Sequence, residues 1–154
     1  MSMLTGCDVS VFQPLALVDW SRFDFGIVRA TYGKSLDKST VGHVARIRAA
    51  GKLVGLYHFF RADQSAEDQF AAYRQLCVDC ELGAGDIAPA VDVEDFPGHQ
   101  IGPGDVPALL EFCDLLRDAF GCAPIIYITQ RDWHRLGKPA WVLEHPLWVA
   151  HYPK

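Results

Sequence analysis

Short apolar segments alternate along the chain with longer segments of helical periodicity, and this order constrains the fold more than any other feature. Six segments rich in β-branched and aromatic residues are typical of strands buried on both faces: residues 4–10, 25–32, 53–60, 87–94, 124–129 and 146–152. Three segments with one apolar face lie between them and predict helices: residues 40–51, 65–83 and 105–121. Repeated strand–helix–strand order predicts one α/β domain, residues 1–154, with a parallel sheet.

The predicted helices carry recognisable start and stop signals. Ser65 is the expected N-cap of the second helix, with Asp68 three positions later, and Asp105 opens the third. Gly51 and Gly121 follow the first and third helices and are expected to end them.

Charge and hydropathy argue against several classes of protein. The formal net charge of −5, without clusters of Lys and Arg, argues against a nucleic-acid-binding surface. No apolar run approaches the roughly 20 residues of a membrane span. The opening "MSMLTGCDVS" has no basic region followed by an apolar one, so no signal peptide is predicted and the localisation stays open.

The cysteines do not form a recognisable framework. Five are scattered along the chain, at Cys7, Cys77, Cys80, Cys113 and Cys122. An odd number argues against a set of paired disulfides, and the CxxC of Cys77 and Cys80 has no second Cys or His pair at zinc spacing. We expect small, buried, reduced side chains, and we predict no metal and no cofactor.

The segment "IAPAVDVEDFPG", residues 87–98, ends a buried strand in a burst of acid. Asp92 and Glu94 lie at i and i+2, so both side chains project to one side of the strand, with Cα atoms about 6.7 Å apart. Two such carboxyls cannot ionise independently, so one titrates high and can act as an acid while the other stays anionic. Glycoside cleavage needs such a pair. Taken alone, the motif fits metal ligation or a solvated strand end equally well.

Further side chains at strand ends favour a sugar site. Asp8 supplies another acid in the first strand, with Ser10 on the same side and Gln13 just beyond. Aromatic residues gather at the ends of other strands: Tyr57, Phe59, Tyr127, Trp148 and Tyr152. Sugar rings stack on aromatic faces while their hydroxyls bind polar groups. Any single ring is explained by core packing, but their joint placement beside acids favours a carbohydrate.

The motifs GCDVSVFQ, VRATYG, AAGKLVGLYHFF, AEDQF, PAVDVED, IIYIT and PLWVAHY occur in this order along essentially the whole chain. In this the chain resembles the glycoside hydrolase family 25 lysozymes, the Chalaropsis-type muramidases. The resemblance implies a TIM-like (β/α) barrel of eight strands. It also implies cleavage of the β-1,4 bond between N-acetylmuramic acid and N-acetylglucosamine in peptidoglycan. By position, Glu94 matches the proton donor, Asp92 and Asp8 match its companion acids, and Tyr57, Tyr127 and Trp148 match residues lining the sugar site; we add Tyr152 as a candidate.

Two departures from the family pattern stand out. Tyr32 occupies a position that is commonly acidic in the family. The chain also shows no counterpart of the last two strands, so we expect a barrel that lacks them. Its open edges, at the first and sixth strands, favour pairing with another copy of the chain.

The sequence leaves function and mechanism partly open. The leading hypothesis is a muramidase of the phage endolysin type, or one released outside the cell, with Glu94 as acid/base. The alternatives are a catalytically inactive wall-binding or phage structural module, and a hydrolase for another N-acetylated glycan or a metal-dependent enzyme. The spacing of Asp92 and Glu94 fits either the retaining or the inverting separation of carboxyls. Attack by the substrate's own acetamido group is a third route.

Overall fold

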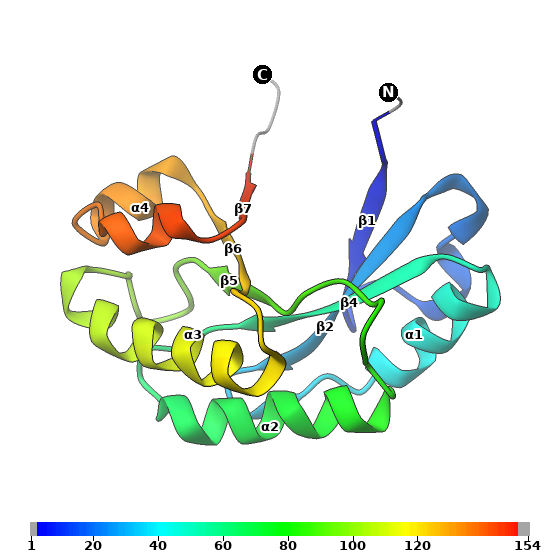
Figure 1. Ribbon diagram of the computed structural model, residues 1–154, viewed down its shortest axis with the longest axis horizontal. Coiled ribbons are helices and arrows are strands. Elements are labelled where there is room, and N and C mark those ends of the chain that lie inside the picture. Colours follow the sequence, from blue (N-terminus) through cyan, green and yellow to red (C-terminus); the bar gives the residue numbers. More distant parts are fainter. Residues whose placement is uncertain (1–2, 151–154) are drawn as a thin grey trace.

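The computed structural model describes residues 3–150, and its centre is a curled sheet, a half-barrel whose strands are almost all parallel (Figure 1). The parallel strands are β1 (Gly6–Val9), β2 (Phe25–Tyr32), β4 (Leu53–Phe59), β5 (Ala90–Val93), β6 (Ile125–Ile128) and β7 (Leu147–Val149). They pair in chain order, from β1 at one edge to β7 at the other. The short β3 (Ser35–Leu36) folds back antiparallel onto β2.

Helices follow the strands as the alternating pattern predicts. They are α1 (Thr40–Ala49), α2 (Ala66–Asp79), α3 (Val106–Phe120) and α4 (Gln130–Arg135). Helices α1, α2 and α3 lie on the convex side of the sheet, and β1 and β7 rise on the other side (Figure 1). Short 3-10 turns occupy Leu15–Leu17, Trp20–Arg22, Pro103–Asp105 and Ala140–Glu144. Within residues 3–150, every helix is too short or too polar to cross a membrane.

The hydrophobic core fills the space between the sheet and the helices. Val28, Val91 and Ile126 of the central strands are fully buried, as are Leu109 and Phe112 of α3. Successive residues of a strand point to opposite faces, so the strand residues immediately before and after Val28, Val91 and Ile126 face the concave side of the sheet. The core therefore fixes one face of the strands and leaves the other face available for a site.

The six predicted strands are confirmed: β2 has the predicted bounds, and the other five are shorter than predicted. Burial on both faces is wrong for the two edge strands. In β1 only Val9 is buried, and in β7 Leu147 and Val149 are exposed. Each edge strand has a single strand neighbour, so its outer side lacks the cover that the central strands receive. Closure into a full barrel is not observed within residues 3–150, and Tyr152 lies outside the described residues.

The predicted helix signals are largely confirmed. The Ser65 side chain caps α2 by accepting a hydrogen bond from the Asp68 N–H at 3.1 Å, and Gly121 ends α3 with φ of 69°. The second helix was predicted to reach residue 83, but it ends at Asp79, because Glu81 adopts a left-handed φ of 52°. Helix α4 and strand β3 were not predicted.

The cysteines match their prediction in part. All five carry free thiols, and Cys77, Cys80 and Cys113 are buried as expected. Two depart from the prediction: Cys7 is only partly buried, because it lies in the edge strand β1, and Cys122 is exposed, because it follows α3 in the turn that leads to β6.

Candidate active site

The predicted acids and rings meet on the concave face of the sheet. Asp92 of β5 lies in register with Tyr127 of β6, which in turn pairs with Trp148 of β7. On the other side, Asp92 pairs with Phe59 of β4, so Tyr57, two residues earlier in that strand, shares its face. Parallel strands present their carboxyl ends at one edge of a sheet, which explains why residues far apart in sequence gather here.

One open cavity contains all the described candidate residues. It has a volume of about 450 Å³ and is lined by Asp8, Tyr57, Asp92, Glu94, Tyr127, Trp148, Val149 and Ala150. The rings of Tyr127 and Trp148 meet edge to face, with centroids 5.2 Å apart. The structure thus brings together six of the seven predicted site residues, and the seventh, Tyr152, lies outside the described part of the chain.

Asp92 is the most strongly perturbed acid of the cavity. Burial, reinforced by the nearby charges of Glu94 and Asp8, raises the pKa of Asp92 to about 8. Its Oδ1 atom is buried and has no hydrogen-bond partner among the described residues. A buried acceptor without a donor is costly, so this oxygen is suited to receive a hydrogen bond from a bound molecule.

The neighbouring groups are perturbed in the same direction. Burial raises the pKa of Glu94, and the negative charge of Asp132 adds to the effect. Asp8 is an exposed residue of the edge strand β1, yet it lines the cavity, and partial desolvation of its carboxyl raises its pKa. Burial and the charge of Asp92 hold the pKa of Tyr57 well above its ordinary value, so its hydroxyl keeps its proton. The cavity therefore holds carboxyls that favour the protonated form.

A partly buried cation that the sequence analysis did not single out balances part of this negative charge. Arg29 of β2 lies in register with Tyr57, and its Nε donates to Asp37 at 2.9 Å. Its charge lowers the pKa of both Asp92 and Tyr57. The only sequence signal is position, since Arg29 lies near the carboxyl end of a predicted strand.

A second group that sequence reasoning missed lies on α4. Asp132 is fully buried and pairs with Arg131, while Asp95, next to Glu94, pairs with Arg135. Thr129 and Asp132 have the spacing of a helix cap, and this signal could have identified the start of α4.

Other residues noted in the sequence have structural roles near the site. Ser10 and Gln13 bond to each other, with the Ser10 N–H donating to Gln13 Oε1 at 2.8 Å. Phe59 stacks on Tyr32, the aromatic residue at the commonly acidic position, with centroids 4.5 Å apart. Among residues 3–150, no three His, Cys, Asp or Glu side chains gather to hold a metal ion.

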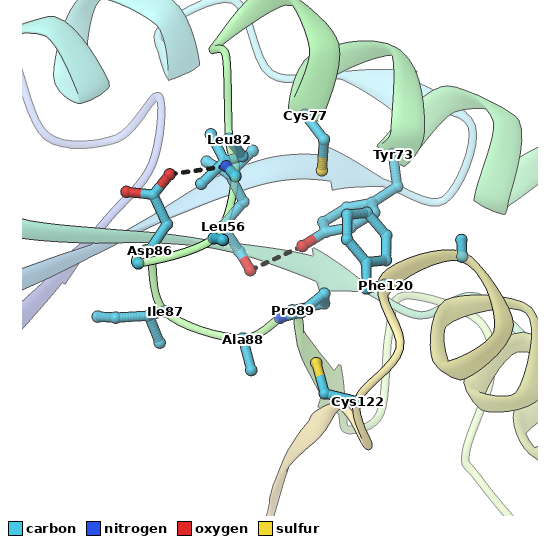
Figure 2. Close-up of a pocket in the computed structure, with 14 residues that line it drawn as sticks. Leu56, Tyr73, Cys77, Leu82, Asp86, Ile87, Ala88, Pro89, Phe120 and Cys122 are labelled. Carbon is cyan, nitrogen blue, oxygen red and sulfur yellow. Dashed lines mark hydrogen bonds between the residues drawn. The ribbon is translucent and has the colours of Figure 1, made fainter.

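A second cavity, of about 350 Å³, lies at the amino ends of β5 and β6 (Figure 2). Its polar groups already have partners or favour the neutral form. The Tyr73 hydroxyl donates to the Leu56 carbonyl, and Asp86 accepts from the Gly83 N–H at 2.9 Å. Burial raises the pKa of the Cys77 thiol to about 12. The second cavity thus lacks the paired carboxyls of the first.

Comparisons with solved structures identify the same fold in longer proteins. A family 25 glycosyl hydrolase from Bacillus anthracis is 22% identical, with a TM-score of 0.77 over 96% of this chain and 70% of its own. A muramidase from Acremonium alcalophilum is 22% identical, with a TM-score of 0.82 over 98% and 78%. A lysozyme from Streptomyces coelicolor is 22% identical, with a TM-score of 0.81 over 99% and 76%.

A comparison with curated protein sequences gives no significant match. The family model of the glycosyl hydrolases family 25 matches residues 7–154, nearly the whole chain. This match agrees with the half-barrel and with the acids at its strand ends. The chain therefore belongs to glycosyl hydrolases family 25.

Proposed function

We propose that this glycoside hydrolase is a lysozyme of the muramidase type, which hydrolyses the β-1,4 bond between N-acetylmuramic acid and N-acetylglucosamine in bacterial peptidoglycan. The observation that carries the proposal is the single cavity in which three carboxyls face three aromatic rings. Rings of this kind stack on sugars, and paired carboxyls cleave glycosidic bonds. The family match and the neighbours named lysozyme and muramidase support the same substrate.

We assign Glu94 the role of general acid and base. It lies at the rim of the cavity, just beyond the end of β5, and it is less buried than the perturbed Asp92. A carboxyl with a raised pKa can carry a proton near neutral pH and deliver it to the leaving oxygen.

We assign Asp92 the task of orienting the substrate's acetamido group, with Asp8 as a supporting charge. The buried Asp92 oxygen lacks a donor, and an amide N–H would supply one. Donation to Asp92 favours its anionic form and so lowers its pKa. Since Asp92 and Glu94 compete for protons, substrate binding would then leave the shared proton on Glu94, beside the scissile bond.

The proposed reaction follows from these roles. Glu94 protonates the glycosidic oxygen as its bond to C1 breaks, and the acetamido carbonyl oxygen forms a new bond to the same carbon. Water then attacks C1 and displaces the acetamido oxygen, while Glu94 takes a proton from the water. Two displacements at C1 give net retention. The unpartnered Asp92 oxygen favours this route over direct attack by a carboxylate.

We also propose that the curled sheet is part of a family 25 barrel that lacks its last two strands. The parallel order from β1 to β7 and the placement of the helices on the convex side support this interpretation (Figure 1). The cavity would then correspond to the carboxyl-end mouth of the barrel, where TIM barrels carry their active sites.

The test compares the parent chain with Glu94→Gln on purified peptidoglycan, with new reducing ends identified by mass spectrometry. We expect the parent to release fragments that end in N-acetylmuramic acid. The variant keeps the shape of the side chain but loses the transferable proton, so its rate should fall about 10²–10⁴-fold without a fall in the melting temperature.

Two outcomes would contradict the proposal. If Glu94→Gln cleaves within a few-fold of the parent, another group supplies the proton. If the parent sediments with peptidoglycan but releases no fragments, the chain is a wall-binding module.

A further inference from the structure

Helix α4 places a buried carboxylate beside the proposed proton donor. The last register pair between β5 and β6 is Val93 with Ile128, so Glu94 and Thr129 come next on adjacent strands. The Thr129 hydroxyl donates to Asp132 Oδ2 at 2.6 Å, and Asp132 is fully buried, with 0% of its surface exposed. The chain thus buries a carboxylate that is bonded to Thr129, the neighbour of Glu94 on the adjacent strand, and its negative charge acts on Glu94.

Two arginines of α4 compensate this charge and also reach the other neighbour of Glu94. Arg131 Nε lies 2.9 Å from Asp132 Oδ1, and its terminal nitrogen lies 3.9 Å from Asp95 Oδ2. Arg135 lies 2.6 Å from the same Asp95 oxygen and 3.7 Å from Asp132. Arg131 therefore links two aspartates: Asp95, which follows Glu94 in the sequence, and Asp132, which acts on Glu94 from α4.

We propose that Arg131 and Asp132 are positioning residues that set the proton affinity of Glu94, and with it the pH range of the reaction. The inference rests on the proposed function, because it concerns the acid of that reaction. A buried aspartate next to an acid favours the acid's protonated form, and an adjacent arginine favours the ionised form. The two residues of α4 therefore act in opposite directions on the same proton.

The charges around Glu94 support this division. Burial raises its pKa first, Asp132 and Asp95 raise it further, and Arg131 lowers it. Asp92 is the remaining carboxyl coupled to Glu94, from its own strand. The Arg131 side chain is 62% exposed, so its charge is partly screened, whereas that of Asp132 is buried. The balance leaves Glu94 with a raised pKa in spite of the arginine.

The test measures the pH–rate profile on purified peptidoglycan for the parent, Arg131→Gln and Asp132→Asn. Loss of the arginine should move the whole profile to higher pH, and loss of the aspartate should move it to lower pH, each by about half a pH unit. Asparagine keeps an acceptor for the Thr129 hydroxyl. Arg117→Gln is the matched control, since it removes one exposed arginine of α3, which pairs with Asp114 at 2.8 Å and lies 3.2 Å from His145 Nε2 rather than beside Glu94. Its profile should coincide with that of the parent.

A second measurement does not depend on turnover. Carbon-13 NMR titration of the Glu94 carboxyl should show its midpoint rising in Arg131→Gln and falling in Asp132→Asn. If Asp132→Asn does not fold, the exposed Arg131 position alone decides. A merely structural role would lower the rate or the melting temperature and leave both the profile and the midpoint in place, which would overturn the inference.

The two proposals fail in different ways. An inactive parent, or a fully active Glu94→Gln, refutes the proposed function. An active parent that needs Glu94, with profiles unmoved or moved in the same direction by both α4 variants, refutes only the role of Arg131 and Asp132.

Discussion

Asp92 illustrates how a single side chain can serve a reaction at the expense of the fold. In the folded protein its pKa is raised to about 8, whereas an unfolded aspartate ionises near pH 3.9. Between these values unfolding releases a proton, so this group makes the free energy of unfolding decrease as the pH rises from about 4 to 8. The buried oxygen without a partner adds to the cost. A bound ligand that donates a hydrogen bond to this oxygen would relieve part of that cost.

We therefore predict that Asp92→Asn stabilises the protein while it impairs catalysis. The amide cannot ionise, so the variant should gain up to roughly 5 kcal/mol over the parent at pH 8 and much less at pH 4. Thermal melts of both proteins across this range measure the difference. A gap between the two melting temperatures that does not widen with pH would show that Asp92 ionises normally in the fold.

The pair of Asp92 and Glu94 also predicts the pH dependence of the rate. At low pH both carboxyls are protonated and no anion is available to orient the acetamido group. Above about pH 8 the raised pKa of Asp92 is passed, both groups are ionised, and no proton remains to donate. We expect a bell with its optimum on the acidic side of neutral, whose limbs belong to the pair as a whole. A flat initial-rate profile from pH 4 to pH 8 would count against catalysis by this pair.

At the scale of elements, Gln69 joins α2 to the end of β4. Its Oε1 accepts from the Arg61 N–H at 2.8 Å and lies 3.0 Å from His58 Nε2, and its Nε2 donates to the Arg61 and Gln64 carbonyls. Gln69 is fully buried, and burial lowers the pKa of His58 to about 3. The loop that follows β4 is therefore held by a neutral, internal network.

We predict that Gln69→Leu destabilises the protein strongly. Leucine fills a similar volume but leaves several buried polar groups without partners, which should cost at least about 2 kcal/mol. Gln75→Leu on the same helix is the control. Gln75 is exposed and bonds to Asp79, one turn later on the same helix, so the change should stay within about 0.5 kcal/mol. Urea denaturation measures both. Equal losses would mean that the network contributes nothing beyond helix propensity.

Elements could be predicted from the sequence wherever burial imposes a pattern. The central strands and the helices α1, α2 and α3 bury apolar faces, so their periodicity is visible in the chain. Helix α4 was not predicted because its sequence, "QRDWHR", has six residues and no apolar stripe. The gathering of Asp8, Asp92 and Glu94 followed from the parallel order alone. The ion pairs that surround them did not, because Asp95 and Arg135 lie 40 positions apart and meet only in the folded chain.

At the scale of the whole molecule, the half-barrel leaves its concave side open. Below the candidate active site lies an apolar cavity of about 560 Å³, lined by residues that include Phe25, Ile27 and Ile125. Within residues 3–150, the outer edges of β1 and β7 have no strand partner. Unpaired edges next to exposed apolar surface favour association of chains.

We predict that the 154-residue chain self-associates through these edges. Light scattering after size-exclusion chromatography should give a mass above that of the monomer, and it should rise with concentration. Leu147→Lys places a charge on the edge strand β7, where the leucine is 41% exposed. Because lysine at a sheet edge opposes strand pairing, this variant should shift to monomer. Val78→Lys is the control, because this 65% exposed residue lies on α2, on the convex side. A parent that stays a stable, fully active monomer at every concentration would mean that the open sheet needs no partner, and that the curl of the strands alone protects its edges.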